Sequence, residues 1–419
     1  MKLENRILTG LALSAFAVCG YAQSISCNTI YGLATNVTGA GATTSGQVCA
    51  KTAQQFIDLT NSSGLQSINP NYTNTSAFTA QGLFNSVLIN LSSPAASPTL
   101  TFSVPQLGIT QSFTGVTRDD SQSQLGDYLK KNNVLGQIMK LQAQTSPTSS
   151  ISGQGGLIPT MISSQFDQNF TQQATDTAAP ASVAAQASSA GKTPNLIGIG
   201  AGYTSLKFKD INASAISIPL SYTIRNDIDP RRQLSFSLPI TVVDMDGAKA
   251  YSGALGVSYR VPMNDQWTLT PAAQYGFVGS VDLATVAAAY SGSLTSTYVI
   301  PKDGYQIAIG NMLGMIKTAK FKGGDYSFSP DISNTVMRNG VMFTQPVAMQ
   351  GKKMSLEYSL IDTRYLGGDK PFADNSQELG ISIGTNKSAF DARSFLRAGF
   401  TYINAKDSKG YRLSVGYWF

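Results

Sequence analysis

The last nine residues of the chain alternate between apolar side chains and side chains that are mostly small or polar. The apolar positions are Tyr411, Leu413, Val415, Tyr417 and Phe419. Because successive side chains of a β-strand point to opposite faces, this segment predicts a strand with one apolar and one mostly polar face. The same alternation recurs in earlier segments. An apolar exterior around a polar interior is typical of a transmembrane β-barrel.

Four of these positions also carry a resemblance. Leu413, Val415, Tyr417 and Phe419 resemble the terminal strand of bacterial outer-membrane proteins, whose last aromatic residue and alternating apolar residues are the assembly signal. The resemblance implies that the barrel-assembly machinery is a partner of this chain.

The N-terminus has the pattern of a secretory signal peptide. Lys2 and Arg6 precede the uncharged, apolar run Ile7–Gly20, and Ala22 ends a small-residue cleavage site. A membrane-spanning helix needs roughly 20 apolar residues, which is more than this run offers. We therefore expect 1–22 to be a signal peptide and the mature chain to start at Gln23.

Cysteine and histidine usage narrows the function. The chain has three cysteines and no histidine. Cys19 leaves with the signal, and Cys27 and Cys49 are predicted to pair as a disulfide in an oxidising compartment. Without histidine, Ser-His and Cys-His catalysis and histidine-based metal sites are excluded. We expect no enzyme activity, no catalytic residues, no cofactor and no metal site.

The formal net charge of +6 is uneven along the chain. Residues 23–190 carry five basic side chains and six aspartates, so the basic excess lies in the C-terminal half. Nucleic acid is not an expected partner of an exported barrel. Outer-membrane lipid, with the phosphates of lipopolysaccharide, is an expected partner, and lysines that simply solubilise loops are an equally good explanation.

Residues 23–173 predict a small α+β region, exported or periplasmic. Expected helices cover Ala50–Thr60, 117–129, a stretch with Leu135, Ile138 and Leu141, and a piece from Pro159 to Phe170, and expected strands cover Leu83–Leu91 and Thr99–Val104. Residues 174–194 follow as an Ala/Ser-rich segment. Two interpretations stay open for its core, Ala174–Ala190: a flexible linker, or a slim segment that threads a barrel lumen.

Residues 195–419 contain twelve segments with strand character. They are Ile197–Tyr203, Ile216–Ile224, Leu234–Val242, Tyr251–Val261, Trp267–Phe277, Tyr290–Ile300, Tyr305–Met315, Asn334–Val347, Met354–Leu360, Leu379–Ile383, Leu396–Tyr402 and Tyr411–Phe419. An even number suits a bacterial barrel with both ends in the periplasm. The fold class predicted is an all-β membrane protein, a 12-stranded antiparallel transmembrane β-barrel. Its longest connections, 317–333 and 364–376, are expected at the extracellular end.

Strand parity places four charges in the lumen. With the apolar face outward, Glu357, Glu378, Arg397 and Arg412 point inward. Ion pairs that stabilise the barrel are the first interpretation, and an ion-selective constriction is the second. Aromatic residues at the outer face predict membrane girdles; they are Tyr203, Tyr222, Tyr251, Tyr259, Trp267, Tyr275, Tyr402 and Tyr417.

Two short motifs invite a ligand. Gly198-Ile-Gly-Ala-Gly202 resembles a nucleotide loop but lies inside a predicted strand, so lumen-facing glycines that leave room for a plug explain it better. Asp244-Met-Asp246-Gly is weakly calcium-like, and a hairpin turn explains it fully.

An exported N-terminal region, a slim linker and a twelve-strand C-terminal barrel together resemble the translocator domain of autotransporters. The resemblance covers about 175–419 and implies an outer-membrane barrel that anchors or exports residues 23–173 as a surface interaction or adhesion module. The alternative is a channel, porin-like or envelope-structural barrel whose N-terminal region is a periplasmic plug. Residues 23–173 depart from typical passengers because they are short and lack an internal repeat.

Overall fold

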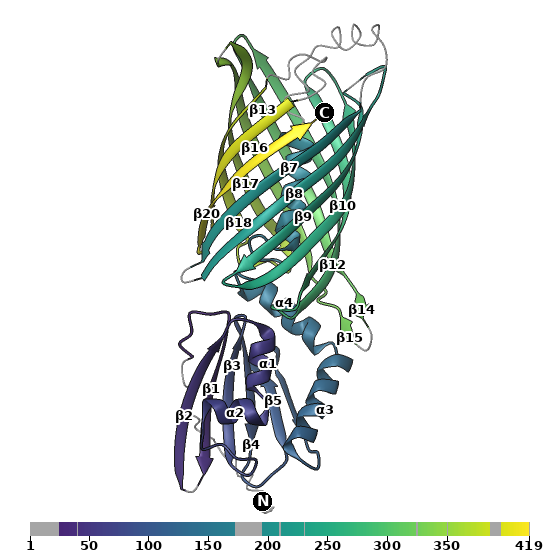
Figure 1. Cartoon of the computed structure of the whole chain (residues 1–419). Helices are drawn as coiled ribbons and strands as arrows, with labels where there is room; N and C mark the ends of the chain where they lie inside the picture. Colours follow the sequence, from purple (N-terminus) through teal and green to yellow (C-terminus); the bar gives the residue numbers. More distant parts are fainter. Residues whose placement is uncertain are drawn as a thin grey trace, which may run out of the picture.

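The computed structural model describes residues 25–39, 41–171, 195–208, 211–229, 231–323, 326–349, 351–385 and 395–418. The predicted signal peptide, the segment Ala174–Ala190 and the terminal Phe419 lie outside these described residues. Three parts follow one another along the chain: a small α+β domain, a helical segment and a closed barrel (Figure 1).

Twelve antiparallel strands form the closed barrel, as the sequence predicts. They are β7 (Leu196–Phe208), β8 (Ile211–Arg225), β9 (Gln233–Met245), β10 (Ala248–Pro262), β11 (Trp267–Ser280), β12 (Thr285–Lys302), β13 (Tyr305–Ala319), β16 (Ser333–Met349), β17 (Lys352–Gly368), β18 (Asn375–Thr385), β19 (Phe395–Ala405) and β20 (Ser408–Trp418). The last strand closes the sheet by pairing with the first, from Ser408↔Phe208 to Trp418↔Gly198. A closed sheet leaves no open edge, which is the condition for strands to cross a bilayer.

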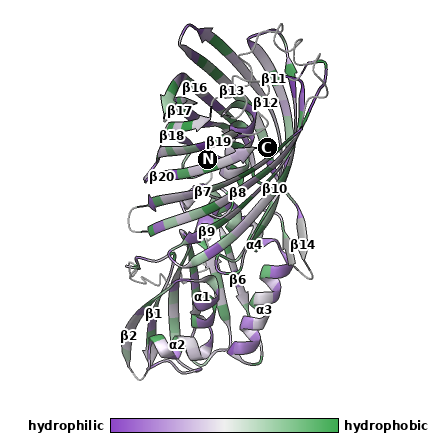
Figure 2. Ribbon diagram, turned by 45° about the horizontal axis from the view of Figure 1, so that its top comes forward, coloured by the Kyte–Doolittle hydropathy of each residue, from purple (hydrophilic) through white to green (hydrophobic). Residues whose placement is uncertain are grey.

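The alternation seen in the sequence separates the two faces of the barrel wall. On β20, Tyr411, Leu413, Val415 and Tyr417 are exposed on the outer face, while Gly416 is buried. Hydrophobic and hydrophilic residues are interspersed along the strands in the same way throughout the barrel (Figure 2). The exposed apolar side chains form a lipid-facing surface, so the chain is a transmembrane β-barrel protein. Among the described residues, none of the helices combines the length and apolar character that a membrane span requires.

The N-terminal domain is a six-stranded sheet covered on one face by helices. Its strands run in the order β2 (Ala42–Ala50), β1 (Tyr31–Gly39), β3 (Ala77–Phe84), β4 (Val87–Ser93), β5 (Leu100–Val104) and β6 (Ile109–Phe113). The covering helices are α1 (Ala53–Leu59), α2 (Ser62–Ile68), α3 (Arg118–Lys131) and α4 (Val134–Thr145), with a short 3-10 turn η1 (Pro105–Leu107). Rings of Tyr31, Phe56 and Phe84 pack in the core with centroids 5.0 to 6.1 Å apart.

One strand prediction in this domain is wrong. Leu83–Leu91 was expected as a single strand, but β3 ends at Phe84 and β4 begins at Val87. Asn85 and Ser86 both have positive φ, 49° and 71°, which is the backbone of a tight hairpin turn. The predicted helix start at Thr117 is confirmed, because the Thr117 side chain accepts from the Asp120 backbone and the Asp120 side chain from that of Thr117.

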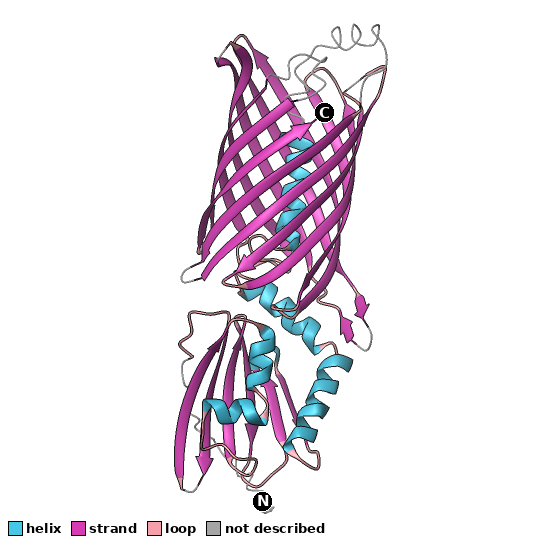
Figure 3. Cartoon of the chain, viewed as in Figure 1, coloured by secondary structure: helices cyan, strands magenta, loops and turns pink. Residues whose placement is uncertain are grey.

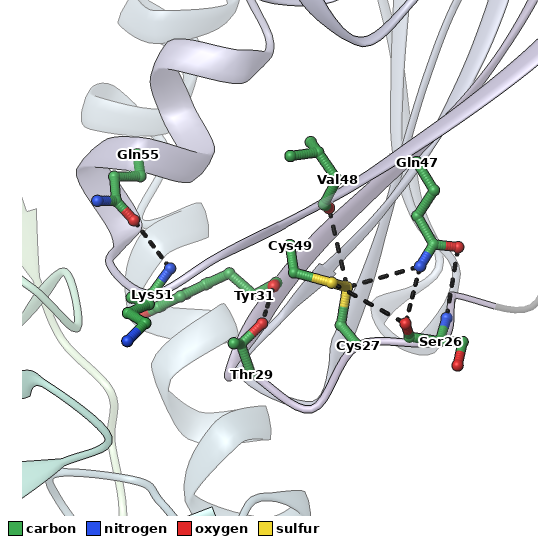
Figure 4. The surroundings of a disulfide bond; sticks show 9 residues. All are labelled: Ser26, Cys27, Thr29, Tyr31, Gln47, Val48, Cys49, Lys51 and Gln55. Atoms are coloured by element: carbon green, nitrogen blue, oxygen red, sulfur yellow. Dashed lines mark hydrogen bonds between the residues drawn. A yellow bond between two sulfur atoms is a disulfide. The ribbon is translucent and has the colours of Figure 1, made fainter.

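The predicted disulfide is confirmed. Cys27 and Cys49 are bonded, and the bond ties the segment before β1 to β2 (Figure 4). Gln47 holds the same segment, because its Nε2 donates to the Ser26 carbonyl oxygen at 2.9 Å. The bond closes a loop of about 21 residues, for which the chain-entropy model gives about 3 kcal/mol of stabilisation.

The N-terminal domain lies at one end of the barrel. The first barrel strand, β7, begins at the other end, and the last strand, β20, ends there. In Figure 1 the domain lies below the barrel, while the C-terminus lies near the upper end. The domain contacts the connection 281–284 after β11, residues 329–331 after β13, and 369–372 after β17. A two-stranded hairpin, β14 (Phe321–Gly323) with β15 (Tyr326–Phe328), extends from the second of these connections.

The connections are less asymmetric than expected. The two long connections predicted for one end, 317–333 and 364–376, do lie together at the end that carries the domain, as 320–332 and 369–374. At the opposite end, 226–232 separate β8 from β9, and β18 ends at Thr385 while β19 begins at Phe395, so long connections occur there too. Connection length alone therefore does not orient this barrel.

Candidate functional site: a plugged barrel lumen

A helical plug occupies the barrel lumen. It consists of α5 (Leu157–Phe166) and the π-helical turn η2 (Asp167–Thr171), and it is the helix seen inside the barrel in Figure 3. Leu157, Met161 and Phe166 are at most 1 % exposed. The chain therefore passes from the N-terminal domain into the lumen, and β7 starts at the far end of the barrel.

Glycines in the wall make room for the plug. At Gly310 of β13 and Gly340 of β16, an added Cβ would lie 2.4 and 2.8 Å from ring atoms of Phe170. Real Cβ atoms do not approach that closely. The phenyl ring therefore packs directly on the strand backbone, and larger residues at these two positions would displace the plug.

Polar side chains join the plug to the same wall. Gln165 Nε2 donates to Ser291 Oγ on β12 at 3.0 Å, and Gln274 Nε2 on β11 donates to Ser164 Oγ at 3.2 Å. These bonds satisfy buried amide donors that would otherwise be costly in a water-poor lumen. The plug is thus attached to β11–β13 and β16, the wall that also supplies the two glycines.

The adjoining wall, β16 to β20, carries an ion-pair cluster centred on Glu378. Glu378 of β18 is 5 % exposed, and its carboxylate lies 2.9 Å from Arg338 Nη2 and 3.5 Å from Arg412 Nη1. Arg338 of β16 is 1 % exposed, donates to Thr363 Oγ1 at 2.6 Å and lies 5.3 Å from the centre of the Phe166 ring. Strands β16, β18 and β20 are thereby linked to each other and to the plug.

A second ion pair contacts the end of the plug. Arg397 of β19 pairs with the buried Glu357 of β17, and both bond to Ser382, whose Oγ donates to Glu357 at 2.7 Å. Arg397 Nη1 also donates to the Thr171 carbonyl oxygen, the last described residue of the plug, at 3.1 Å. This contact fixes the far end of the described plug to the wall.

The plug contributes its own charge to the cluster. Asp167 interacts electrostatically with Arg338, Arg412 and Arg397. Together with Glu357 and Glu378, it supplies three carboxyl groups beside these three arginines. The plug therefore takes part in the same cluster of acidic and basic groups as the wall.

Strand parity in the sequence predicts four of the six charged residues of this lumen cluster. Glu357, Glu378, Arg397 and Arg412 all lie in the lumen, in contact with one another or with Arg338. Arg338 was missed although it has inward parity between the outward Met337 and Asn339, because alternation in this segment is poor. Asp167 was not predicted because the arginines near it lie more than 150 positions further along the sequence.

A cavity remains between the plug and the wall. Its volume is about 300 Å³, and it extends from Gln154 beside the start of the plug to Gly416 near the opposite end. The lining is rich in glycine, serine and threonine, and the predicted motif Gly198–Gly202 contributes to it. Gln168 is 9 % exposed, lines this space, and has no hydrogen-bond partner for Nε2 among the described residues. We expect water to fill the cavity.

The N-terminal domain is attached to the barrel mouth by specific contacts. The backbone N–H of Ala53 donates to the Asp282 carbonyl oxygen at 2.7 Å, and Tyr31 Oη donates to the same oxygen at 3.2 Å. Burial, assisted by the nearby Asp282 carboxylate, raises the pKa of the Tyr31 hydroxyl. This phenol therefore stays protonated and remains a donor.

A second contact lies between the helices and the long connection. Asn133 donates to the Ser329 carbonyl oxygen and accepts from its N–H, both at 3.0 Å. Lys140 Nζ lies 2.9 Å from the Asp369 carboxylate and donates to the Asp331 carbonyl oxygen at 2.9 Å. The domain is docked on the barrel at two separate sites.

The remaining predicted features are structural. Asp246 and Gly247 have φ of 54° and 95°, and the Gly247 N–H donates to Asp244 Oδ1, so this motif is a hairpin turn. Within the described residues, side chains of His, Cys, Asp and Glu do not gather in threes that would hold a metal ion.

Comparisons with known proteins find likeness of fold. No family model matches the chain, and no curated protein matches it either. Among solved structures, it is similar to the β-domain of the Bordetella autotransporter BrkA, at 12% identity over 54% of this chain and 98% of that one, with a TM-score of 0.42. The translocator domain of NalP from Neisseria meningitidis follows at 14% identity, 57% and 93% coverage and 0.39, and the NanC porin at 11%, 53% and 98%, and 0.35.

Proposed function

We propose that this chain anchors its N-terminal domain on the extracellular side of the outer membrane, with the connecting segment held inside the barrel. The observation that carries the proposal is the route of the chain. The domain is docked at one mouth, α5 and η2 fill the lumen, and β7 starts at the opposite end.

The orientation follows from the barrel termini. In bacterial barrels with an even number of strands both ends lie in the periplasm. The end with Leu196 and Trp418 is then periplasmic, and the mouth that carries the domain is extracellular. This arrangement favours an anchored surface module over a periplasmic attachment.

The face of the sheet that carries no helices is the surface of the domain that we propose for ligand contact. Two rows of directly opposite residues cross its strands and contain hydroxyl and amide groups without a single charge. The first row is Ser45, Asn36, Thr79, Ser92, Thr101 and Ser112, and the second includes Gln47, Gln81, Asn90, Ser103 and Thr110. Neutral donors and acceptors on a flat sheet suit an uncharged polar ligand better than a charged one.

Protease treatment of intact cells tests the location. We expect the domain to be cleaved from outside, while the barrel with α5 inside it stays protected. A matched sample with a permeabilised outer membrane should give the same barrel fragment. A domain that is cleaved only after permeabilisation would refute the extracellular location.

A channel is the second candidate function, and the cavity beside the plug supports it. A water-filled space of about 300 Å³ along the plug would pass only water and small ions. The plug occupies the lumen beside this space, so a porin-like conductance requires that the plug moves.

A further inference from the structure

An island of polar side chains interrupts the lipid-facing surface of β13, β16 and β17. Asn311, Asn339, Asp362 and Arg364 all have the outward parity of these strands. They are neighbours in the register, where Asn311 is opposite Asn339 and Asn339 is opposite Asp362. Gln377 of β18 extends the island, because its Nε2 donates to Asp362 Oδ1 at 3.1 Å.

Apolar residues flank this island along β13, β16 and β17, while on β18 the island reaches the strand start at Asn375. Toward the domain end, the outward neighbours Leu313, Met337 and Leu366 are exposed. Toward the opposite end, Val341 and Leu360 are exposed as well. On these three strands the polar groups therefore lie between apolar residues of the outer surface.

Aromatic rings set the depth of the island. Tyr305, Phe343 and Tyr358 follow one another on the outer surface, with ring centroids 5.4 and 6.3 Å apart, as residues of a membrane girdle do. Asp362 is four residues from Tyr358, which is about 13 Å along the strand. At a strand tilt of about 40° this is about 10 Å along the membrane normal, inside an apolar band about 25 Å tall.

Several hydrogen-bonding groups of the island lack protein partners. Asn311 Nδ2 donates to Asn339 Oδ1 at 2.7 Å, and Arg364 Nε donates to Asp362 at 2.8 Å. The other amide atoms, Asn311 Oδ1 and Asn339 Nδ2, form no hydrogen bond within the described part of the chain. The same holds for Nη1 and Nη2 of Arg364. Lipid tails offer no partners, so each of these groups is costly when it faces lipid alone.

We propose that the β13–β16–β17 face is the contact surface between two copies of this chain in the membrane. The unpaired groups are self-complementary: one copy offers an amide oxygen on Asn311 and an amide N–H on Asn339, and a two-fold axis brings the reverse order opposite to them. Arg364 in turn offers donors to the acidic Asp362 of the second copy. Small polar contacts of this kind hold membrane-embedded elements together where no hydrophobic driving force exists.

Position-specific cross-linking tests the surface. Met337 is 36 % exposed on β16, two residues from Asn339, and Met337→Cys in the full-length protein should form a disulfide-linked dimer in outer membranes under mild oxidation. Ile216→Cys on β8, which is 55 % exposed and lies across the barrel in the strand order, is the matched control and should stay monomeric. If Met337→Cys gives no more disulfide-linked dimer than Ile216→Cys, the proposal is overturned.

A second cross-linking experiment removes the polar groups of the island. Asn311→Leu with Asn339→Leu, added to Met337→Cys, should lower the cross-linked fraction at least tenfold while the barrel keeps its heat-modifiable migration. Should that variant fail to assemble, Arg364→Gln takes its place, with a smaller loss expected. An undiminished dimer in the assembled variant, or wild-type protein of single-chain mass in lipid nanodiscs, would also overturn the proposal and leave the island facing lipid or a different protein.

Discussion

The ion pair between Arg338 and Glu378 offers a quantitative test of how the plug and barrel are held together. Both side chains are buried in the lumen, 1 % and 5 % exposed, with 2.9 Å between nitrogen and oxygen. Breaking a buried pair leaves an uncompensated charge and costs about 3–5 kcal/mol. Asp167 and Arg412 remain beside the survivor, so we expect the low end, about 3 kcal/mol, for Glu378→Leu and for Arg338→Met.

The double variant separates a coupled pair from two independent residues. Replacing both partners by apolar residues leaves no uncompensated charge, so the double variant should lose less than either single variant, far from the about 6 kcal/mol that independent sites would give. The assay is urea unfolding of the barrel in lipid vesicles, followed by the fluorescence of its two tryptophans. Lys207→Met, an exposed residue of the outer face, is the control and should change the free energy of unfolding by less than about 0.5 kcal/mol. Additive losses would refute the coupling, and single variants without any loss would show that the lumen charges are solvated.

Three further predictions concern assembly, the disulfide and the plug. Phe419→Asp should leave unassembled protein without heat-modifiable migration, because we expect the last strand with its aromatic residue to act as the assembly signal; undiminished folded barrel would contradict this. Thiol labelling of denatured, unreduced mature protein should find Cys27 and Cys49 blocked, and two free thiols would disprove the bond. Removing 23–190 behind an intact signal should raise conductance in planar bilayers severalfold, whereas full-length protein that already conducts as well would rule out a plugged lumen. In that opened pore, Arg397→Glu with Arg412→Glu should shift selectivity toward cations, and unchanged selectivity would mean that these side chains do not face the ion path.

The barrel could be predicted from sequence because membrane strands carry their own signal. Each needs one apolar face, so Tyr251–Val261 or Leu396–Tyr402 alternates without help from distant residues. Strand ends were less predictable: β17 extends to Gly368, eight residues beyond the predicted end at Leu360. After Leu360 the outward positions of this strand carry the polar Asp362 and Arg364, so the apolar alternation on which the prediction rests is lost there.

The N-terminal domain was less predictable because one of the two faces of its sheet is polar. β1 carries Tyr31, Leu33 and Val37 toward the helices, but Gly32, Ala34 and Asn36 on its other face blur the period. Asn85-Ser86 turns the chain without the glycine that usually marks a tight hairpin, so the strand predicted over Leu83–Leu91 runs across the turn. Residues such as Asp167 acquire their role only when the plug meets strands far along the chain.

Labelling the two mouths of the barrel from outside the cell tests the central claim most directly. Val281, in the connection beside the N-terminal domain, and Ile228, in a connection at the opposite end, are 81 % and 84 % exposed. With a membrane-impermeant maleimide, Val281→Cys should react in intact cells, and Ile228→Cys should react only once the outer membrane is permeabilised. Labelling of Ile228→Cys alone in intact cells would place the domain in the periplasm and contradict the account.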